Sequence, residues 1–215
     1  MKRLNTFYNF QAMIIKDLRL VDYQSTCDAM RAFTAHRDQL SQDELWLVEH
    51  APVFTQGLNG KDEHVLDSGD IPVIKTDRGG QVTYHGPGQL IAYTLFDLKR
   101  LNIGVREMVS HMENSVINML DDLGIKANAR VDAPGVYVDD RKIAALGLRV
   151  KHGSCYHGLS INVSMDLTPF SFINPCGYQG MEVIDLKSLG YDMTMFQAQQ
   201  QFISAFKTQM SKVKK

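Results

Sequence analysis

Short strand-like runs gather in the middle of the chain, with helical patterns before and after them, and this order restricts the possible folds. Apolar residues at helical spacing predict helices over 22–38, 104–123 and 193–212. The strand-like runs are MIIKDLRL, ELWLVEH, PVIKTD, LIAYTLFDL, APGVYVDD, RKIAALGLRV and SCYHGLSINV. Because strands and helices do not alternate strictly, the pattern favours an α+β fold in which helices flank a mixed, mostly antiparallel sheet.

The length and composition suit one globular domain. The chain has 215 residues, 44% of them hydrophobic and 22% charged, with a formal net charge of -1, which is enough to bury a sizeable core. Near-zero net charge argues against nucleic acid as a partner, and no apolar run has the length of a membrane span. Without a signal-peptide pattern, we expect a cytoplasmic protein with an N-terminal extension over 1–12 and a single domain over 13–215.

A glycine-rich, polar segment, RGGQVTYHGPGQL, lies between two of the strand-like runs and covers 78–90. It matches neither of the two common phosphate-binding patterns, GxxxxGK[ST] and GxGxxG. A plain hairpin turn is one interpretation, but a hairpin needs only about two to five residues and does not need so many polar side chains. The surplus of polar groups favours a binding site.

The three cysteines are too few, and odd in number, to form a disulfide framework. Cys27 falls on the apolar stripe of the first predicted helix and is interpreted as a core residue. Cys155 and His157 form a C-x-H pair, but two ligands are short of a metal site. Cys176 lies in the loop NPCGYQG, where it is either a reactive thiol or a buried loop residue.

A nucleophilic cysteine needs a partner that balances or takes its proton. Four side chains are candidates for this role: His85, His152, His157 and Lys142. Lys142 alternates with apolar residues in RKIAALGL, so its amine is either partly desolvated or, as in most strand lysines, exposed to solvent. The residues alone leave both choices open.

Three motifs in order, RGGQVTYHGPGQL, DAPGVYVDDRKIAALGLRV and HGLSINVSMDLTPFSFINPCGYQGM, closely resemble those of the lipoyl(octanoyl) transferases. These are the octanoyl-[acyl-carrier-protein]:protein N-octanoyltransferases. VEHAPVFTQG and TDRGG fit the same family, and the likeness covers roughly 13–189. The resemblance implies a biotin/lipoate protein ligase-like fold. It implies no metal and no cofactor.

The resemblance also implies a site. Cys176 would be the acyl-thioester nucleophile, and Lys142 would lower its thiol pKa and act as general acid and base. The implied substrate-binding residues are Arg78, Gly79, Gly80, Gln81, Val82, Thr83, Tyr84, His85, Ala145, Leu146, Gly147, Gly158, Leu159 and Ser160. In an acyl slot of this kind, we expect the glycines to make room and the two leucines to supply apolar lining.

The implied reaction is transfer of an octanoyl group from octanoyl-acyl carrier protein to a lysine of lipoyl domains, the first step of endogenous protein lipoylation. The acceptors would be the lipoyl domains of 2-oxoacid dehydrogenase E2 subunits and the glycine cleavage H protein. We expect a monomer that contacts neither nucleic acid nor membrane. An ATP-using lipoate or biotin ligase and a non-catalytic binding protein are the alternatives. A basic docking surface would use Arg78, Arg141, Arg149, Lys151 and His152, unless these form an ordinary solvated strand edge.

Overall fold

The computed structural model describes residues 13–175 and 180–213, and its largest element is a seven-stranded sheet. Only the pairing of β1 with β2 is parallel, and the other pairs are antiparallel. The strands lie in the order β1 (Ile14–Val21), β2 (Glu44–His50), β6 (Gln89–Asp97), β10 (Ser154–Asn162), β9 (Arg141–Lys151), β8 (Gly135–Val138) and β7 (Asn128–Ala129). This confirms the predicted mixed, mostly antiparallel sheet.

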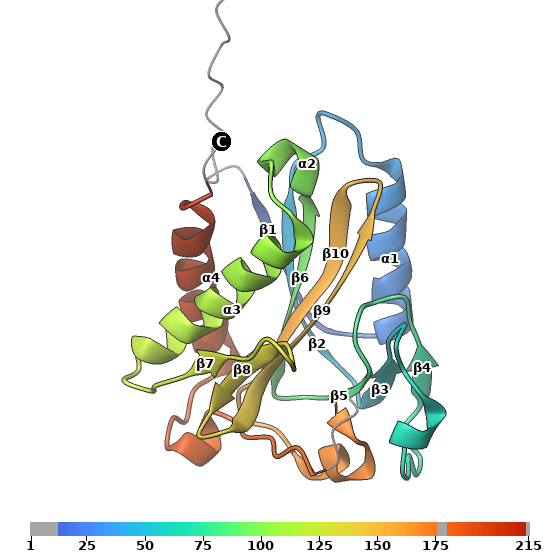
Figure 1. Ribbon diagram of the computed structural model, residues 1–215, viewed down its shortest axis with the longest axis vertical. Helices are drawn as coiled ribbons and strands as arrows, with labels where there is room; N and C mark the ends of the chain where they lie inside the picture. The colour runs from blue at the N-terminus through green and yellow to red at the C-terminus, as the bar shows by residue number, and fades with distance from the viewer. Residues whose placement is uncertain (1–12, 176–179, 214–215) are drawn as a thin grey trace, which may run out of the picture.

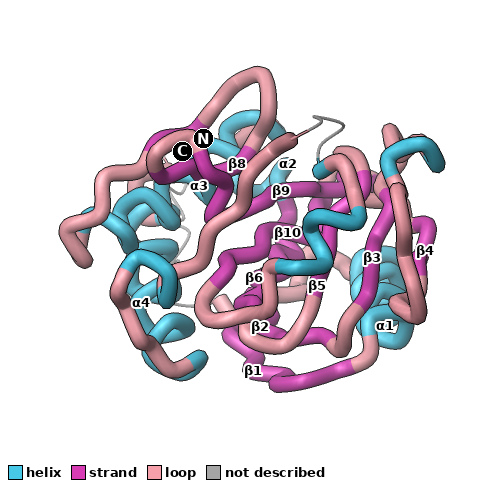
Figure 2. Tube along the Cα trace, turned by 90° about the horizontal axis from the view of Figure 1, so that it is seen from below, coloured by secondary structure: helices cyan, strands magenta, loops and turns pink. Residues whose placement is uncertain are grey.

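A second, three-stranded sheet lies beside the large one. Its order is β4 (Val73–Lys75), β3 (Val53–Gln56) and β5 (Val82–His85). The view in Figure 2 places this sheet on the α1 side of the molecule, away from α4. The glycine-rich segment therefore does not close a hairpin within one sheet, because it leads from the small sheet at β5 into the large sheet at β6.

Helices cover both faces of the large sheet (Figure 1). One face carries α1 (Tyr23–His36), and the other carries α3 (Val105–Asp121) and α4 (Met195–Met210), which pack together. The shorter helical turns are α2 (Leu98–Leu101), η2 (Asp62–His64), η3 (Thr168–Phe172) and η5 (Lys187–Leu189). The three long helices confirm those predicted from apolar spacing to within two residues at each end. None of the described helices has the length and apolar character to cross a membrane.

Local signals explain where the helices begin and end. The Asp22 side chain accepts the N–H of Ser25 at 2.8 Å and caps α1, which satisfies one of the free donors of the first turn. Thr194 and Gln197 form a capping box at the start of α4. After α3 the chain turns at Gly124, whose φ of 76° suits glycine.

The core divides along the faces of the sheet. The larger cluster lies under α3 and α4 and contains the methionine stripe Met108, Met112 and Met119, as predicted. The smaller cluster lies under α1 and contains Cys27, which is 1% exposed. This confirms the interpretation of Cys27 as a core residue, and both layers hold the central strands rigidly in place.

Candidate active site

A cavity opens between the central strands of the large sheet and the glycine-rich segment. It holds about 730 Å³ of empty space, its open mouth included, and β9 and β10 form one side. The predicted substrate-binding residues that border it are Arg78, Gly80, Gln81, Val82, Thr83, His85, Ala145, Leu146, Gly147, Gly158, Leu159 and Ser160, together with Lys142. Residues from three separate stretches of the sequence therefore meet at one cavity.

Two of the described predicted residues, Gly79 and Tyr84, do not border the cavity. The N–H of Gly79 donates to the carbonyl of Leu148 at 2.9 Å and fastens the segment to β9. The ring of Tyr84 packs against Phe170, with the ring centroids 5.6 Å apart. Cys176 falls in 176–179, outside the described residues, so its role stays a prediction.

The small residues of β9 and β10 leave the room in the cavity. Ala145 pairs with Ser160, and Gly147 pairs with Gly158. A Cβ on Gly147 would lie 2.7 Å from the carbonyl oxygen of Gly79, so the close approach of the segment requires glycine there. Leu146 and Leu159 border the cavity, but they also pack with the large core cluster on the α3 side.

Arg78 ties the glycine-rich segment to β3. Its Nε and Nη2 donate to Oγ1 of Thr55 at 3.1 and 2.9 Å, and Nη1 donates to the carbonyl of Gly79 at 2.9 Å. Nη2 also donates to the carbonyl of Gln81 at 2.8 Å. Because only 8% of Arg78 is exposed, it does not belong to the outer basic surface that the sequence suggested, and it shapes one side of the cavity instead.

His85 belongs to a buried polar network behind the cavity. The amide nitrogen of Gln89 donates to the side-chain oxygen of Asn162 at 2.9 Å, so the amide oxygen of Gln89 accepts Nδ1–H of His85 at 2.7 Å. This leaves Nε2 of His85 facing Oγ1 of Thr55 at 3.4 Å. Complete burial lowers the pKa of His85 to about 3, since the charged ring would lose its solvation. His85 is therefore neutral at pH 7.

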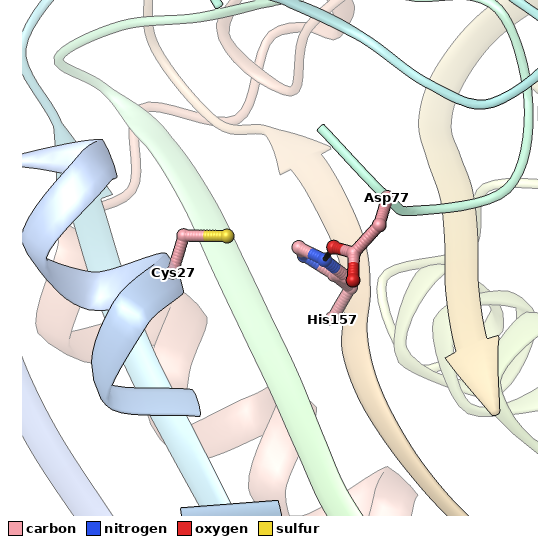
Figure 3. Close-up of side chains that lie close together, drawn as sticks. All are labelled: Cys27, Asp77 and His157. Carbon is pink, nitrogen blue, oxygen red and sulfur yellow. Dashed lines mark hydrogen bonds and ion pairs between the residues drawn. The ribbon is translucent and has the colours of Figure 1, made fainter. Parts of the chain in front are cut away.

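His157 faces the carboxylate of Asp77, which precedes Arg78 in the chain (Figure 3). Neighbouring strand residues usually point to opposite faces, yet both Tyr156 and His157 donate to Asp77. A left-handed backbone at His157, with φ of 61°, turns its side chain to the same side. These bonds, together with one from Arg31 at 3.1 Å, hold the pKa of Asp77 well below its usual range.

Asp77, His157 and Cys27 also bring three possible metal-ligand atoms within 4.8 Å of one another. Burial raises the pKa of the Cys27 thiol, so the thiolate that a metal would need is disfavoured. The guanidinium of Arg31, 3.1 Å from Asp77, would repel a cation. The cluster is better described as an anchor for the loop at 76–79. Cys155, from the C-x-H pair, lies apart in the core, where burial raises its pKa to about 11.

Lys142 is buried, which decides between the two interpretations left open by the sequence. Only 3% of the residue is exposed. Its Nζ donates to the carbonyl of Pro134 at 3.2 Å and lies 5.2 Å from the centroid of the Tyr137 ring. Its backbone N–H donates to the carbonyl of Glu182 at 2.9 Å. Pro175 also borders the cavity, so the described chain on both sides of 176–179 reaches the site.

Lys142 and His157 mark opposite ends of the cavity. The strand register pairs His157 with Leu148, six residues along β9 from Lys142. At about 3.3 Å per residue, the two backbones are ~20 Å apart. Tyr93 pairs with Gly158 and borders the cavity at the His157 end, where it hydrogen-bonds Nε2 of His50 at 2.8 Å. The cavity is therefore long, with a cationic end and an aromatic end.

Sequence reasoning missed two carboxylates that support the site. Asp77 belongs to the motif TDRGG, and its position directly before Arg78 is the sequence feature that could have indicated its role at the site. Glu113 is on α3 and is only 9% exposed. The sequence places Glu113 directly after Met112, beside the apolar stripe of this helix. A charged residue there indicates a buried partner, because charged residues are rarely buried without one.

Comparison with known proteins places the chain in a family. The family model described as the lipoyl protein ligase A/B catalytic domain matches residues 22–207. An octanoyltransferase of Chromobacterium violaceum is 61% identical over 185 residues, which cover 86% of this chain and 89% of the relative. An octanoyltransferase of Shewanella halifaxensis is 57% identical over 199 residues, covering 93% and 91%.

Solved structures share the fold at low sequence identity. A lipoate protein ligase from Thermoplasma acidophilum with bound lipoic acid is 16% identical, with a TM-score of 0.76 over 92% of this chain and 86% of that one. Biotin protein ligase from Aquifex aeolicus is 12% identical, with a TM-score of 0.57 over 95% and 70%. The chain therefore belongs to the lipoyl protein ligase A/B catalytic domain family and is, within it, an acyltransferase of the octanoyltransferase group with the biotin/lipoate protein ligase-like fold.

Proposed function

We propose that the chain transfers an octanoyl group from octanoyl-acyl carrier protein to a lysine of lipoyl domains, through a thioester on Cys176. Octanoyl transfer in lipoylation follows from the octanoyltransferase relatives. The observation that carries the cysteine relay is the buried Lys142 at the cavity end where the chain approaches Cys176. A cation buried at that position favours a thiolate beside it.

In the first step, the Cys176 thiolate attacks the thioester carbonyl of the donor. A free thiol with a pKa of about 8.5 is only a few per cent thiolate at pH 7, so the Lys142 ammonium raises the reactive fraction. The bond from carbonyl carbon to Cys176 sulfur forms, and the bond to the carrier protein's thiol breaks. Lys142 gives a proton to the departing thiolate and becomes a neutral amine.

In the second step, a lysine of the lipoyl domain attacks the acyl-enzyme. This lysine first releases its ammonium proton to solvent and attacks as a neutral amine. Its nitrogen then loses a second proton to the neutral Lys142, and the Cys176 thiolate leaves as the amide forms. His85 is a poor acceptor, because its Nδ1 already donates to Gln89 and burial opposes its charging. The strand register places His157 at the far end of the cavity. Both observations favour Lys142 as the group that carries the proton.

The octanoyl chain would lie along β9 and β10, from the Lys142 end toward the His157 end. Burying eight carbons contributes roughly 5 kcal/mol, at about 0.8 kcal/mol per methylene. The aromatic end then limits the chain length. The polar groups of Tyr93 and His50 are satisfied by each other, so they can face a methyl end without a lost hydrogen bond.

Proposed partners are octanoyl-acyl carrier protein as donor, and as acceptors the lipoyl domains of 2-oxoacid dehydrogenase E2 subunits and the glycine cleavage H protein. A solved archaeal relative of the same fold is described together with its E2 lipoyl domain, which supports the acceptor class. A related lipoate-protein ligase is described with bound ATP. An ATP-dependent ligase reaction is thus the competing function.

The deciding experiment is intact mass spectrometry after mixing the protein with octanoyl-acyl carrier protein, without ATP. The proposal expects one octanoyl group on the protein, its loss on adding apo lipoyl domain, and no adduct for Cys176→Ala. Cys27→Ala removes a core thiol and serves as the matched control that keeps the adduct. Transfer by Cys176→Ala, or a strict need for ATP, would refute the cysteine relay.

A further inference from the structure

A buried carboxylate on α3 and the buried amine on β9 meet the same peptide group. The N–H of Gly135 donates to Oε1 of Glu113 at 3.1 Å. The carbonyl of Pro134, in the same peptide, accepts from Nζ of Lys142 at 3.2 Å. In a trans peptide these two groups point in opposite directions, so Glu113 and Lys142 bind its two sides. A hydrogen bond at one end polarises the peptide and strengthens the bond at the other.

Gly135 is needed for this arrangement. A Cβ at this position would lie 2.7 Å from the carbonyl oxygen of Ala144, and 2.8 Å from Cε and 3.2 Å from Nζ of Lys142. Its φ of 152° also lies outside the range that side chains favour. The Lys142 side chain therefore rests directly on the Pro134–Gly135 peptide, and the position of that peptide fixes the position of the amine.

The charges around the pair are few among the described residues. Glu113 is the acidic group that α3 contributes here. Burial raises its pKa, and the Gly135 N–H and the positive charge of Lys142 offset only part of that rise. On the β8 side lies Tyr137, whose ring contacts Lys142 at 5.2 Å and Arg130 at 5.1 Å. Glu182, in the segment paired with the start of β9, is the other acidic neighbour along the chain. The thiol of Cys176 lies outside the described residues.

We propose that Glu113 is a positioning residue for Lys142, which acts through the Pro134–Gly135 peptide to fix the amine at the cavity. The role rests on the proposed function, in which Lys142 balances the thiolate and carries the proton. A buried carboxylate costs stability unless it has such a partner. The Gly135 N–H gives the carboxylate of Glu113 such a partner on the apolar face of α3.

The test is the pH dependence of octanoyl transfer by Glu113→Gln, which keeps the size of the side chain and an acceptor oxygen but removes the charge. Without the charge, the amine of Lys142 loses an electrostatic partner. We expect the basic limb of the kcat profile to move down by about 0.5 to 1 pH unit. On that limb we expect kcat to fall about three- to ten-fold, the factor that corresponds to about 0.5 to 1 pH unit, with KM for the donor unchanged. Glu107→Gln, on the exposed side of the same helix, is the control and should match the wild type.

Further variants separate this inference from folding and from the proposed function. If Glu113→Gln fails to fold, Glu113→Met suits the apolar surroundings and carries the same expected shift. Glu113→Asp retains the charge and should restore the basic limb. If Glu113→Gln lowered kcat equally at every pH and left the basic limb of the kcat profile where it is in the wild type, the positioning role would be overturned. If Lys142→Met keeps the wild-type limb, Lys142 is not the titrating group, and the proposed function fails instead.

Discussion

Nε2 of His157 donates to a carboxylate oxygen of Asp77 at 3.0 Å and joins two residues 80 positions apart in the chain. The same carboxylate accepts from Tyr156 and Arg31. Asp77 therefore anchors the loop at 76–79 to β10 and α1. Since Arg78 follows directly and shapes the cavity, this bond holds one side of the site in place.

Asp77→Asn is expected to destabilise the protein by about 2 kcal/mol at pH 7, because charged hydrogen bonds are worth about 1.5–3 kcal/mol each and an amide can replace only part of them. The folded-state pKa of Asp77 is lowered, so its contribution is present above the unfolded pKa of about 3.9 and is lost as pH falls below it. Urea unfolding at pH 7 and pH 3.5 should show a smaller pH dependence in the variant. Asp28→Asn, which removes the exposed partner of the same arginine, should behave as wild type; equal losses in both variants would contradict the anchor role.

His85 makes stability depend on pH in the mildly acidic range. Its folded pKa is lowered to about 3 by burial, against about 6.5 when unfolded. The unfolded chain thus binds a proton that the folded chain does not, so the stabilising contribution is complete above pH 6.5 and declines below it. Urea unfolding between pH 7 and pH 4.5 should give a shallower slope for His85→Gln than for the wild type. The exposed His36→Gln should leave the slope unchanged; a His85→Gln slope equal to wild type would rule out this assignment.

Ala145→Leu should shorten the cavity and shift the preferred acyl chain below eight carbons. Ala145 borders the cavity opposite Ser160, and each methylene excluded weakens binding by about 0.8 kcal/mol, roughly four-fold. The measurement is kcat/KM for hexanoyl, octanoyl and decanoyl carrier protein. Ile203→Ala, on α4 with its side chain packed against the large core cluster and away from the cavity, should lower stability without changing the order of the three substrates. An unchanged order in Ala145→Leu would show that the chain binds elsewhere.

A substitution at Gly80 would test the acyl slot less clearly than Ala145→Leu does. The sequence alone suggests that Gly80→Val blocks the slot more than it harms stability. The structure gives Gly80 a φ of 87°, so a valine would strain the backbone as well. Ala145 tests the cavity without that strain.

Gly135→Ala should disturb β8, β9 and the Lys142 side chain together, because the added Cβ would lie 2.7 Å from the carbonyl oxygen of Ala144 and 2.8 Å from Cε of Lys142. We expect the transfer rate to fall about 100-fold, because a displacement of a catalytic group by about 1 Å lowers the rate by roughly that factor. Gly124→Ala is the matched control: it has a φ of 76° and no atom within 4 Å of the added Cβ. It carries backbone strain alone, so its transfer rate at 20 °C should stay near wild type while its Tm falls. Similar rates for the two variants would remove the steric link to Lys142.

Local patterns in the sequence predicted the elements well. The methionine stripe that ends at Met119 and the apolar position of Cys27 predicted two helices and their buried faces, because a helix repeats every 3.6 residues and its core side follows from spacing alone. The motifs also predicted which stretches form the cavity, and most of those residues border it. The strand PVIKTD was placed correctly, but nothing in its own pattern showed that it belongs to a second sheet.

The sequence by itself therefore determined the helices, most strands and which stretches of the chain border the cavity. Only the tertiary structure decided how those side chains are used: that Arg78 is turned inward, that Lys142 is buried, and that Glu113 meets it through a shared peptide. The physical reason is that periodicity depends on neighbours in the chain, whereas burial and hydrogen-bond partners depend on segments far away in sequence. His157 shows this most clearly, because its left-handed backbone and its bond to Asp77 exist only once β10 and the loop at 76–79 pack together.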